Sequence, residues 1–161
     1  MESSGATDRE LTEAEKRANV IRLAFDNDVA KLDLFVELIK KAIPGNTGVV
    51  LRGSAVTGFR WKDGAPFDAD GPGTSDLDLT LVGDRILSYF VPTGFFVPGV
   101  HSRPLSESDP EIAPDLVPLR KRLMAMVKRP VNIQGTRDIV MYLRGELIGQ
   151  PYLTLVEKTG E

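Results

Sequence analysis

The sequence predicts a single domain of the α/β (α+β) class, in which helices flank a small mixed β-sheet. Its 161 residues suit one domain with short appended segments. The clearest signal is DLDLTLV, residues 76–82, where polar and apolar residues alternate strictly, as in a strand with one buried face. Stretches with helical periodicity lie on both sides of this strand, and we expect them to cover its apolar face.

Two helices are predicted within residues 11–44, after a polar tail at residues 1–10. Thr12 and Glu15 have the spacing of a capping box, which marks the start of a helix. Apolar residues then recur at helical intervals in two sets, which are Leu11, Ala14, Ala18, Ile21 and Phe25, and then Val29, Leu32, Phe35, Val36, Ile39 and Ile43. The turn-forming residues 44–46 (PGN) end the second helix.

Residues 45–161 are predicted to form the sheet domain, within what is a single domain overall. Besides 76–82, strands are expected at 48–52, 131–134 and 151–157. Helices are expected at 84–90, 116–127 and 136–143. Residues 58–74 and 91–115 are rich in Gly and Pro and are expected to be loops. Loops of this length are unusual in a compact domain and are often functional.

Composition excludes several classes of function. The chain has no Cys, so it has neither a disulfide framework nor thiolate chemistry. Its net charge of −3 provides no overall basic field that would attract nucleic acid. No apolar run is long enough to span a bilayer, and the polar, acidic residues 1–9 do not resemble a signal peptide. We therefore expect a cytoplasmic protein without a membrane partner.

Asp76 and Asp78 are the first candidates for a functional site. Because side chains alternate along a strand, both carboxylates share one face, while Leu77 and Leu79 face the core. Two carboxylates this close repel each other unless a cation lies between them, and an oxygen-rich pair with open positions suits Mg²⁺ or Mn²⁺. The alternative is that the two acids merely form the solvated face of an amphipathic strand.

A second candidate is the Gly53-Ser54 pair, which follows the strand GVVLR at residues 48–52. Glycine allows the backbone to approach a phosphate closely, and the free N–H groups of such a turn can hold an anion. The hydroxyl of Ser54 adds a donor. On its own the strand-Gly-Ser pattern is also found in ordinary turns.

Taken in order, LRGSAVTG and GTSDLDLTLVG resemble the signature of the nucleotidyltransferase superfamily related to DNA polymerase beta. That signature is Gly-Ser, a short helix and loop, and then Asp-x-Asp, often preceded by Ser, which is Ser75 in this chain. The resemblance is specific over residues 49–83 and looser over 116–157. It implies a small mixed sheet with the two motifs on adjacent strands.

The resemblance also implies an activity, the Mg²⁺-dependent transfer of a nucleoside monophosphate from an NTP to an acceptor. By this analogy Asp76 and Asp78 are the metal ligands and catalytic residues. Gly53, Ser54 and Ser75 would bind the nucleotide, the first two at its β- and γ-phosphates. The acceptor could be a protein, as for antitoxin-type members of the family, an RNA end or a small molecule.

The chain departs from the family at the third carboxylate, which active members carry on a neighbouring strand. The aligned residue is Asn132, whose neutral amide cannot act as a general base near neutral pH. We expect Asn132 to lie beside the predicted strand 76–82, on the face of its two aspartates. Asp138 and the loop acids Asp63, Asp68 and Asp70 are alternative sources of the third acid.

Two further questions stay open at the level of sequence. The spacer between Ser54 and Asp76 is longer than in minimal members of the family, so the extra segment 61–73 (WKDGAPFDADGPG) forms either a lid or a surface excursion. The basic residues of 120–129 could meet phosphates, although a solvated helix face is the simpler interpretation. Three functions therefore compete, namely a nucleotidyltransferase, an NTP-Mg²⁺-binding module with weak or no turnover in a regulatory or antitoxin-type subunit, and a plain structural domain.

Overall fold

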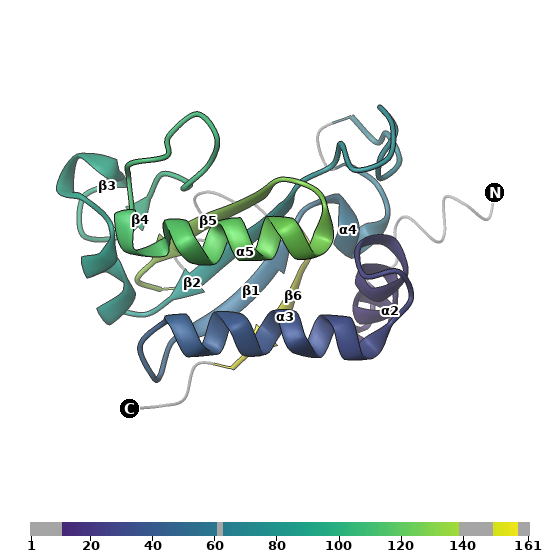
Figure 1. The fold of residues 1–161 in the computed structure, drawn as a ribbon, viewed down its shortest axis with the longest axis horizontal. Helices are drawn as coiled ribbons and strands as arrows, with labels where there is room; N and C mark the ends of the chain where they lie inside the picture. The colour runs from purple at the N-terminus through teal and green to yellow at the C-terminus, as the bar shows by residue number, and fades with distance from the viewer. Residues whose placement is uncertain (1–10, 61–62, 139–149, 158–161) are drawn as a thin grey trace.

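A computed structural model describes residues 11–60, 63–138 and 150–157. They form a mixed α+β fold around a six-stranded sheet with the strand order β3-β4-β5-β2-β1-β6 (Figure 1). Its central strands are β1 (Gly48–Arg52), β2 (Leu77–Val82) and β5 (Val131–Thr136). Strand β6 (Tyr152–Val156) lies at one edge, and the short strands β4 (His101–Ser102) and β3 (Phe95–Val97) lie at the other. The predicted fold class and the four predicted strands, β1, β2, β5 and β6, are confirmed.

Strand directions bring the two sequence motifs to one end of the sheet. Strand β1 is antiparallel to β2, so the end of β1 lies beside the start of β2, with Arg52 opposite Asp78. Strand β2 is parallel to β5, so the two strands begin together, with Asp78 opposite Asn132. Parallel neighbours need a crossover connection, and the chain between β2 and β5 includes helix α5 (Val117–Val127).

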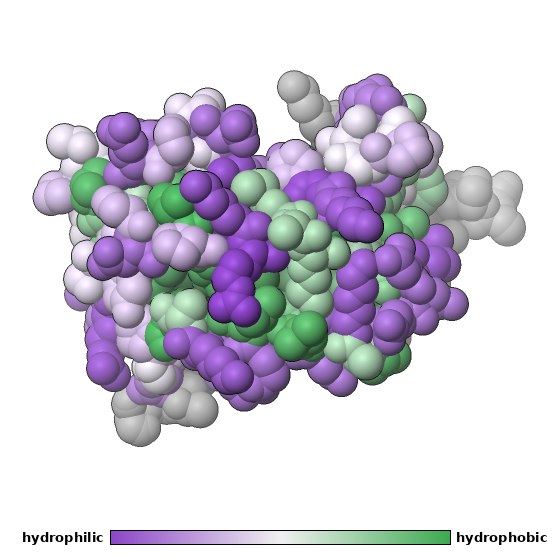
Figure 2. Space-filling view, viewed as in Figure 1, coloured by the Kyte–Doolittle hydropathy of each residue, from purple (hydrophilic) through white to green (hydrophobic). Residues whose placement is uncertain are grey.

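Helices α5 and α3 (Val29–Ala42) lie across one face of the sheet (Figure 1). The core beneath them contains the apolar face of β2, with Leu77, Leu79 and Leu81 all buried as the alternation predicts. The outer surface of the two helices mixes polar and apolar residues (Figure 2). No helix in the described parts of the chain is long and apolar enough to cross a membrane.

Helix α2 (Glu13–Ala24) begins with the predicted capping box, in which Glu15 N donates to Thr12 Oγ1 at 3.1 Å. Its buried face agrees with the predicted one at Ile21 and Phe25, which pack in the core, but differs from it nearer the start of the helix. Val20 and Ala24 are buried, whereas Ala14 and Ala18 are exposed. The inward side of the helix also includes Asn19, whose side chain donates to the carbonyl of Val56 at 2.9 Å, a contact at long range.

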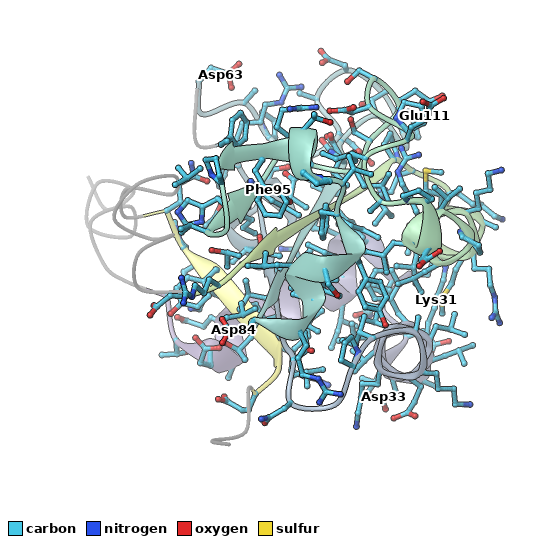
Figure 3. All side chains as sticks on the ribbon, turned by 90° about the vertical axis from the view of Figure 1, so that its left-hand side faces the viewer. Lys31, Asp33, Asp63, Asp84, Phe95 and Glu111 are labelled. Atoms are coloured by element: carbon cyan, nitrogen blue, oxygen red, sulfur yellow. The ribbon has the colours of Figure 1, made fainter. Side chains whose placement is uncertain are left out.

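Residues 84–116 are more ordered than predicted. The expected helix at 84–90 is a 3-10 helix, η1 (Arg85–Tyr89), and the expected loop contains η2 (Pro92–Gly94), β3 (Phe95–Val97), β4 (His101–Ser102) and η3 (Pro114–Leu116). Phe95, labelled in Figure 3, belongs to β3, the edge strand of the sheet on the side that faces the viewer. Strands of two or three residues are too short to show a period, and β4 is held by side chains such as Gln134, whose Nε2 donates to the carbonyl of Ser102 at 2.6 Å.

The segment after β5 differs from its prediction in one respect. Thr136 was expected to cap a helix over 136–143, but it is the last residue of β5 and pairs with His101 of β4. Arg137 and Asp138 are not helical, and residues 139–143 of the expected helix lie outside the described residues.

Candidate functional site

The two aspartates of the predicted motif and Asn132 meet at the start of β2. Asp76 immediately precedes β2 and Asp78 lies within it, so their side chains share the polar face of the strand. The amide nitrogen of Asn132 donates to Asp76 Oδ2 at 2.8 Å and to Asp78 Oδ1 at 3.0 Å. The prediction that Asn132 lies beside both carboxylates is therefore confirmed.

Gly53 and Ser54 lie beside Asp78, at the end of β1. Gly53 has φ +104° and ψ −170°, a conformation open essentially only to glycine. A Cβ atom added at Gly53 would lie 3.3 Å from Oδ2 of Asp78. Ser54 is buried and begins the short helix α4 (Ser54–Thr57). The backbone of Gly53 thus approaches the carboxylate more closely than any other residue type could without strain.

These residues line a pocket of about 470 Å³. All five predicted site residues are in its wall, which consists of Arg52, Gly53, Ser54, Arg60, Asp70, Thr74, Ser75, Asp76, Asp78 and Gln150. The residues come from the ends of β1 and β2 and from the segment between them. Segments 58–60 and 63–74, which lie next to α4 (Figure 1), therefore flank the pocket through Arg60, Asp70 and Thr74.

The electrostatics of the pocket centre on Asp78, whose side chain is 26% exposed. Burial raises the pKa of Asp78 above its usual value, and the negative charge of Asp76 adds to this effect. The Arg52 guanidinium, with Nη1 3.8 Å from Asp78 Oδ2, and the amide of Asn132 oppose the rise in pKa. The protein itself therefore only partly offsets the cost of a negative charge on Asp78.

Arg52 is held across the sheet from β1 to β5. Its Nη2 donates to Gln134 Oε1 at 2.9 Å, and the other end of that amide holds β4, as described above. Arg52 was missed in the sequence. Its only signal there is a charged residue at the end of the otherwise apolar strand 48–52.

Ser75 connects the pocket to an anchored segment of the loop. The Ser75 hydroxyl accepts a hydrogen bond from Asp68 N at 2.8 Å, and Ser75 N donates to Asp68 Oδ1 at 3.0 Å. Arg129 donates from Nη1 and Nη2 to the Asp68 carboxylate at 2.7 and 3.1 Å, and from Nη1 to the Ser75 carbonyl at 2.9 Å. This cluster fixes the backbone immediately before Asp76.

The alternative acids are placed less favourably than Asp76 and Asp78. Asp138 follows the far end of β5, whereas Asn132 is near the start of that strand, so Asp138 does not reach the pair. Asp63 points away from the body of the protein (Figure 3). Asp68 is paired with Arg129, and Asp70 lines the pocket but accepts a hydrogen bond from Arg60 Nη2 at 2.7 Å.

The basic residues around α5 do not all form a solvated face. Arg120 is buried and donates from Nε to the carbonyl of Val131 at 2.7 Å, and the Arg129 side chain is only 8% exposed. Lys121, Arg122 and Lys128 are exposed, as expected. The two buried arginines tie α5 and the turn after it to β5 and to the loop, and neither lines the pocket.

Within the described residues, no group of three or more His, Cys, Asp or Glu side chains is placed to hold a metal ion. The carboxylate pair is therefore the basis of any cation site in this pocket. Comparison of the chain with models of protein families, with curated proteins and with solved structures gave no match.

Proposed function

We propose that the protein binds an NTP with Mg²⁺ or Mn²⁺ in this pocket and transfers a nucleoside monophosphate to an acceptor. The supporting observation is the meeting of the Gly53-Ser54 turn with Asp76 and Asp78 in one pocket wall. In the transfer, an acceptor oxygen bonds to the α-phosphorus and the bond to the pyrophosphate oxygen breaks. Pyrophosphate leaves with the electron pair, and the proton of the acceptor passes to water.

The residues present suit a hard divalent cation. Asp76 and Asp78 offer carboxylate oxygens on one face, and Gly53 leaves the space beside Asp78 open. Burial and mutual repulsion make the ionised pair costly without a cation, which is consistent with the raised pKa of Asp78. Bound there, the cation would supply charge neutralisation for the phosphates.

The chain itself supplies positive charge and shape for the triphosphate. Arg52 and Arg60 both line the pocket, and guanidinium groups bind phosphate oxygens through paired N–H donors. Arg60 also contacts Asp70 and Asp63, at 2.7 and 3.5 Å, so phosphate binding would exchange one of these ion pairs for another. The acceptor could be a protein, an RNA end or a small molecule.

A second candidate is an NTP-Mg²⁺-binding module with weak or no turnover, and Asn132 favours it. The amide of Asn132 lies next to both carboxylates, where the family has a third acid, and it cannot accept a proton near neutral pH. General-base assistance is worth about 10²–10⁴-fold in rate. Transfer that is slow by this factor, in a regulatory or antitoxin-type subunit, is the expected behaviour of such a module.

Two measurements separate these functions. Calorimetric titration with a non-hydrolysable NTP analogue and Mg²⁺ tests binding, and transfer of label from the four α-labelled NTPs tests turnover. Asp76→Ala combined with Asp78→Ala should abolish Mg²⁺-dependent binding. The matched control is Asp84→Ala, which removes an exposed carboxylate beyond the other end of β2. Binding without label transfer supports the second candidate, and absence of binding by the wild type contradicts both.

A further inference from the structure

A row of polar side chains crosses the three central strands at the pocket end of the sheet, and it carries fewer negative charges than a site for two cations requires. Arg52, Asp78 and Asn132 are in register on β1, β2 and β5. Arg52 Nη1 lies 3.8 Å from Asp78 Oδ2, while Asn132 Nδ2 reaches both Asp78 Oδ1 and Asp76 Oδ2. Each carboxylate is thus already contacted by a donor of the protein.

The charges in this row differ from those of a three-carboxylate site. Two carboxylates and one guanidinium leave a single formal negative charge, and Asn132 adds none. Two divalent cations about 3.5–4 Å apart repel each other strongly, and bridging carboxylates normally offset that repulsion. Here the third acid is absent, and Arg52 adds a positive charge to the same row.

We propose that this pocket binds its nucleotide with one divalent cation on Asp76 and Asp78, and that the positive charge of Arg52 and the neutral amide of Asn132 prevent the binding of a second. This inference rests on the proposed function, since it assumes that an NTP binds here. Arg52 is fixed for this role by Gln134 of β5, which accepts from its Nη2 at 2.9 Å. The guanidinium then supplies a permanent positive charge beside the phosphates, and this charge does not depend on the concentration of divalent cation.

The test is a count of bound Mn²⁺ in the full chain saturated with a non-hydrolysable NTP analogue. Equilibrium dialysis gives the number of ions, and electron paramagnetic resonance distinguishes an isolated Mn²⁺ from a coupled pair. We expect one ion per chain and an uncoupled spectrum for the wild type. Two coupled ions in the wild type would overturn the inference while leaving the proposed function intact.

Two variants test whether Arg52 and Asn132 are what limits the pocket to one bound ion. Asn132→Asp restores a third carboxylate and should raise the count to two, with a coupled spectrum. Arg52→Gln removes the guanidinium and should strengthen binding of a second ion. Asn27→Asp adds the same charge as the first variant at an exposed turn outside the pocket wall, and should leave the count at one.

The remaining outcomes also decide between the alternatives. A count that stays at one in both Asn132→Asp and Arg52→Gln would overturn the assignment to these residues. A wild type that binds neither the analogue nor Mn²⁺ would instead contradict the proposed function itself. Because the wild-type count is decisive by itself, the test does not depend on the folding of either variant.

Discussion

Arg129 holds Asp68 through two hydrogen bonds of 2.7 and 3.1 Å, although the two residues are 61 positions apart in the sequence. The pair joins the loop after α4 to the turn that leads into β5. The guanidinium also stacks on Phe67, with Cζ 4.5 Å from the ring centroid. The side chains are 8% and 22% exposed, so this ion pair is much better shielded from water than a surface pair.

Arg129→Met should lower the free energy of unfolding by about 3 kcal/mol, because removing one partner leaves a poorly solvated charge on the other. Urea denaturation measures the change. Arg122→Met is the matched control, since Arg122 is exposed in α5, and its effect should stay within about 0.5 kcal/mol. Equal effects of the two substitutions would contradict a structural role for the buried pair.

The stability of the protein should fall in acid partly through Asp68. The Arg129 guanidinium, with backbone N–H groups of Ser75 and Gly73, lowers the pKa of Asp68 from 3.8 to about 2 despite burial. Because this pKa is lowered, the ionised Asp68 stabilises the fold fully above pH 3.8, and this stabilisation is lost as the pH falls through 2. It contributes about 2 kcal/mol to the free energy of unfolding.

The check is the difference in unfolding free energy between wild type and Asp68→Asn, measured from pH 6 to pH 2. Other carboxylates cancel in this difference. We expect the wild type to be more stable at pH 6 and the gap to narrow steadily below pH 4. A gap that does not depend on pH would show that the charge of Asp68 is not what stabilises the loop.

Asp78 should have the opposite effect on stability. Burial raises the pKa of Asp78, so its ionised form destabilises the fold above that raised pKa, and the penalty disappears as the pH falls to the ordinary value. Asp78→Asn should therefore stabilise the protein without cation at pH 7, by up to about 1 kcal/mol. The same variant should lose Mg²⁺-dependent binding of nucleotide. Thermal unfolding with and without Mg²⁺ and nucleotide measures both effects, and a less stable variant at pH 7 would refute this account.

Gly53→Ala should destabilise the fold and weaken nucleotide binding together. Its φ of +104° with ψ −170° strains any other residue, and the new Cβ would lie 3.3 Å from Asp78 Oδ2. We expect the free energy of unfolding to fall by about 1–3 kcal/mol.

Gly58→Ala is the matched control, because Gly58 also has a positive φ, +91°, but a Cβ there would meet nothing within 4 Å. Its conformation is left-handed helical, which costs a non-glycine residue less. Urea denaturation and calorimetric titration compare the two variants. If Gly58→Ala weakens nucleotide binding as much as Gly53→Ala, backbone strain alone explains the effect and the contact with Asp78 is irrelevant.

Much of the candidate site could be predicted from local pattern. Alternation along 76–82 places Asp76 and Asp78 on one face and the intervening leucines in the core, because successive side chains of a strand point in opposite directions. The same rule places Asn132 on the polar face of β5. The antiparallel pairing of β1 and β2 places the Gly-Ser turn beside the aspartates, as expected for motifs on adjacent strands.

The failures of prediction concern contacts between distant segments. The strands β3 and β4 are too short to show a period. Strand β4 contacts Gln134 and Thr136 of β5, and β3 pairs with β4. The inward face of α2 includes Asn19, and no periodicity encodes its hydrogen bond to Val56. In the sequence Arg129 is one residue of a basic run, because its partner Asp68 is 61 positions away.

The sequence by itself indicated the fold class, the four longer strands and the shared face of Asp76 and Asp78, since these follow from the periodicity of individual segments. The parallel pairing of β2 and β5 then brings Asn132 to that face. Only the tertiary structure decided which charges surround that face. Strand order and direction placed Arg52 beside Asp78. The packing of the loop against the turn before β5 brought Arg129 into contact with Asp68, 61 positions away in the sequence. Such neighbours depend on how separate segments pack, because electrostatic interactions act through space rather than along the chain.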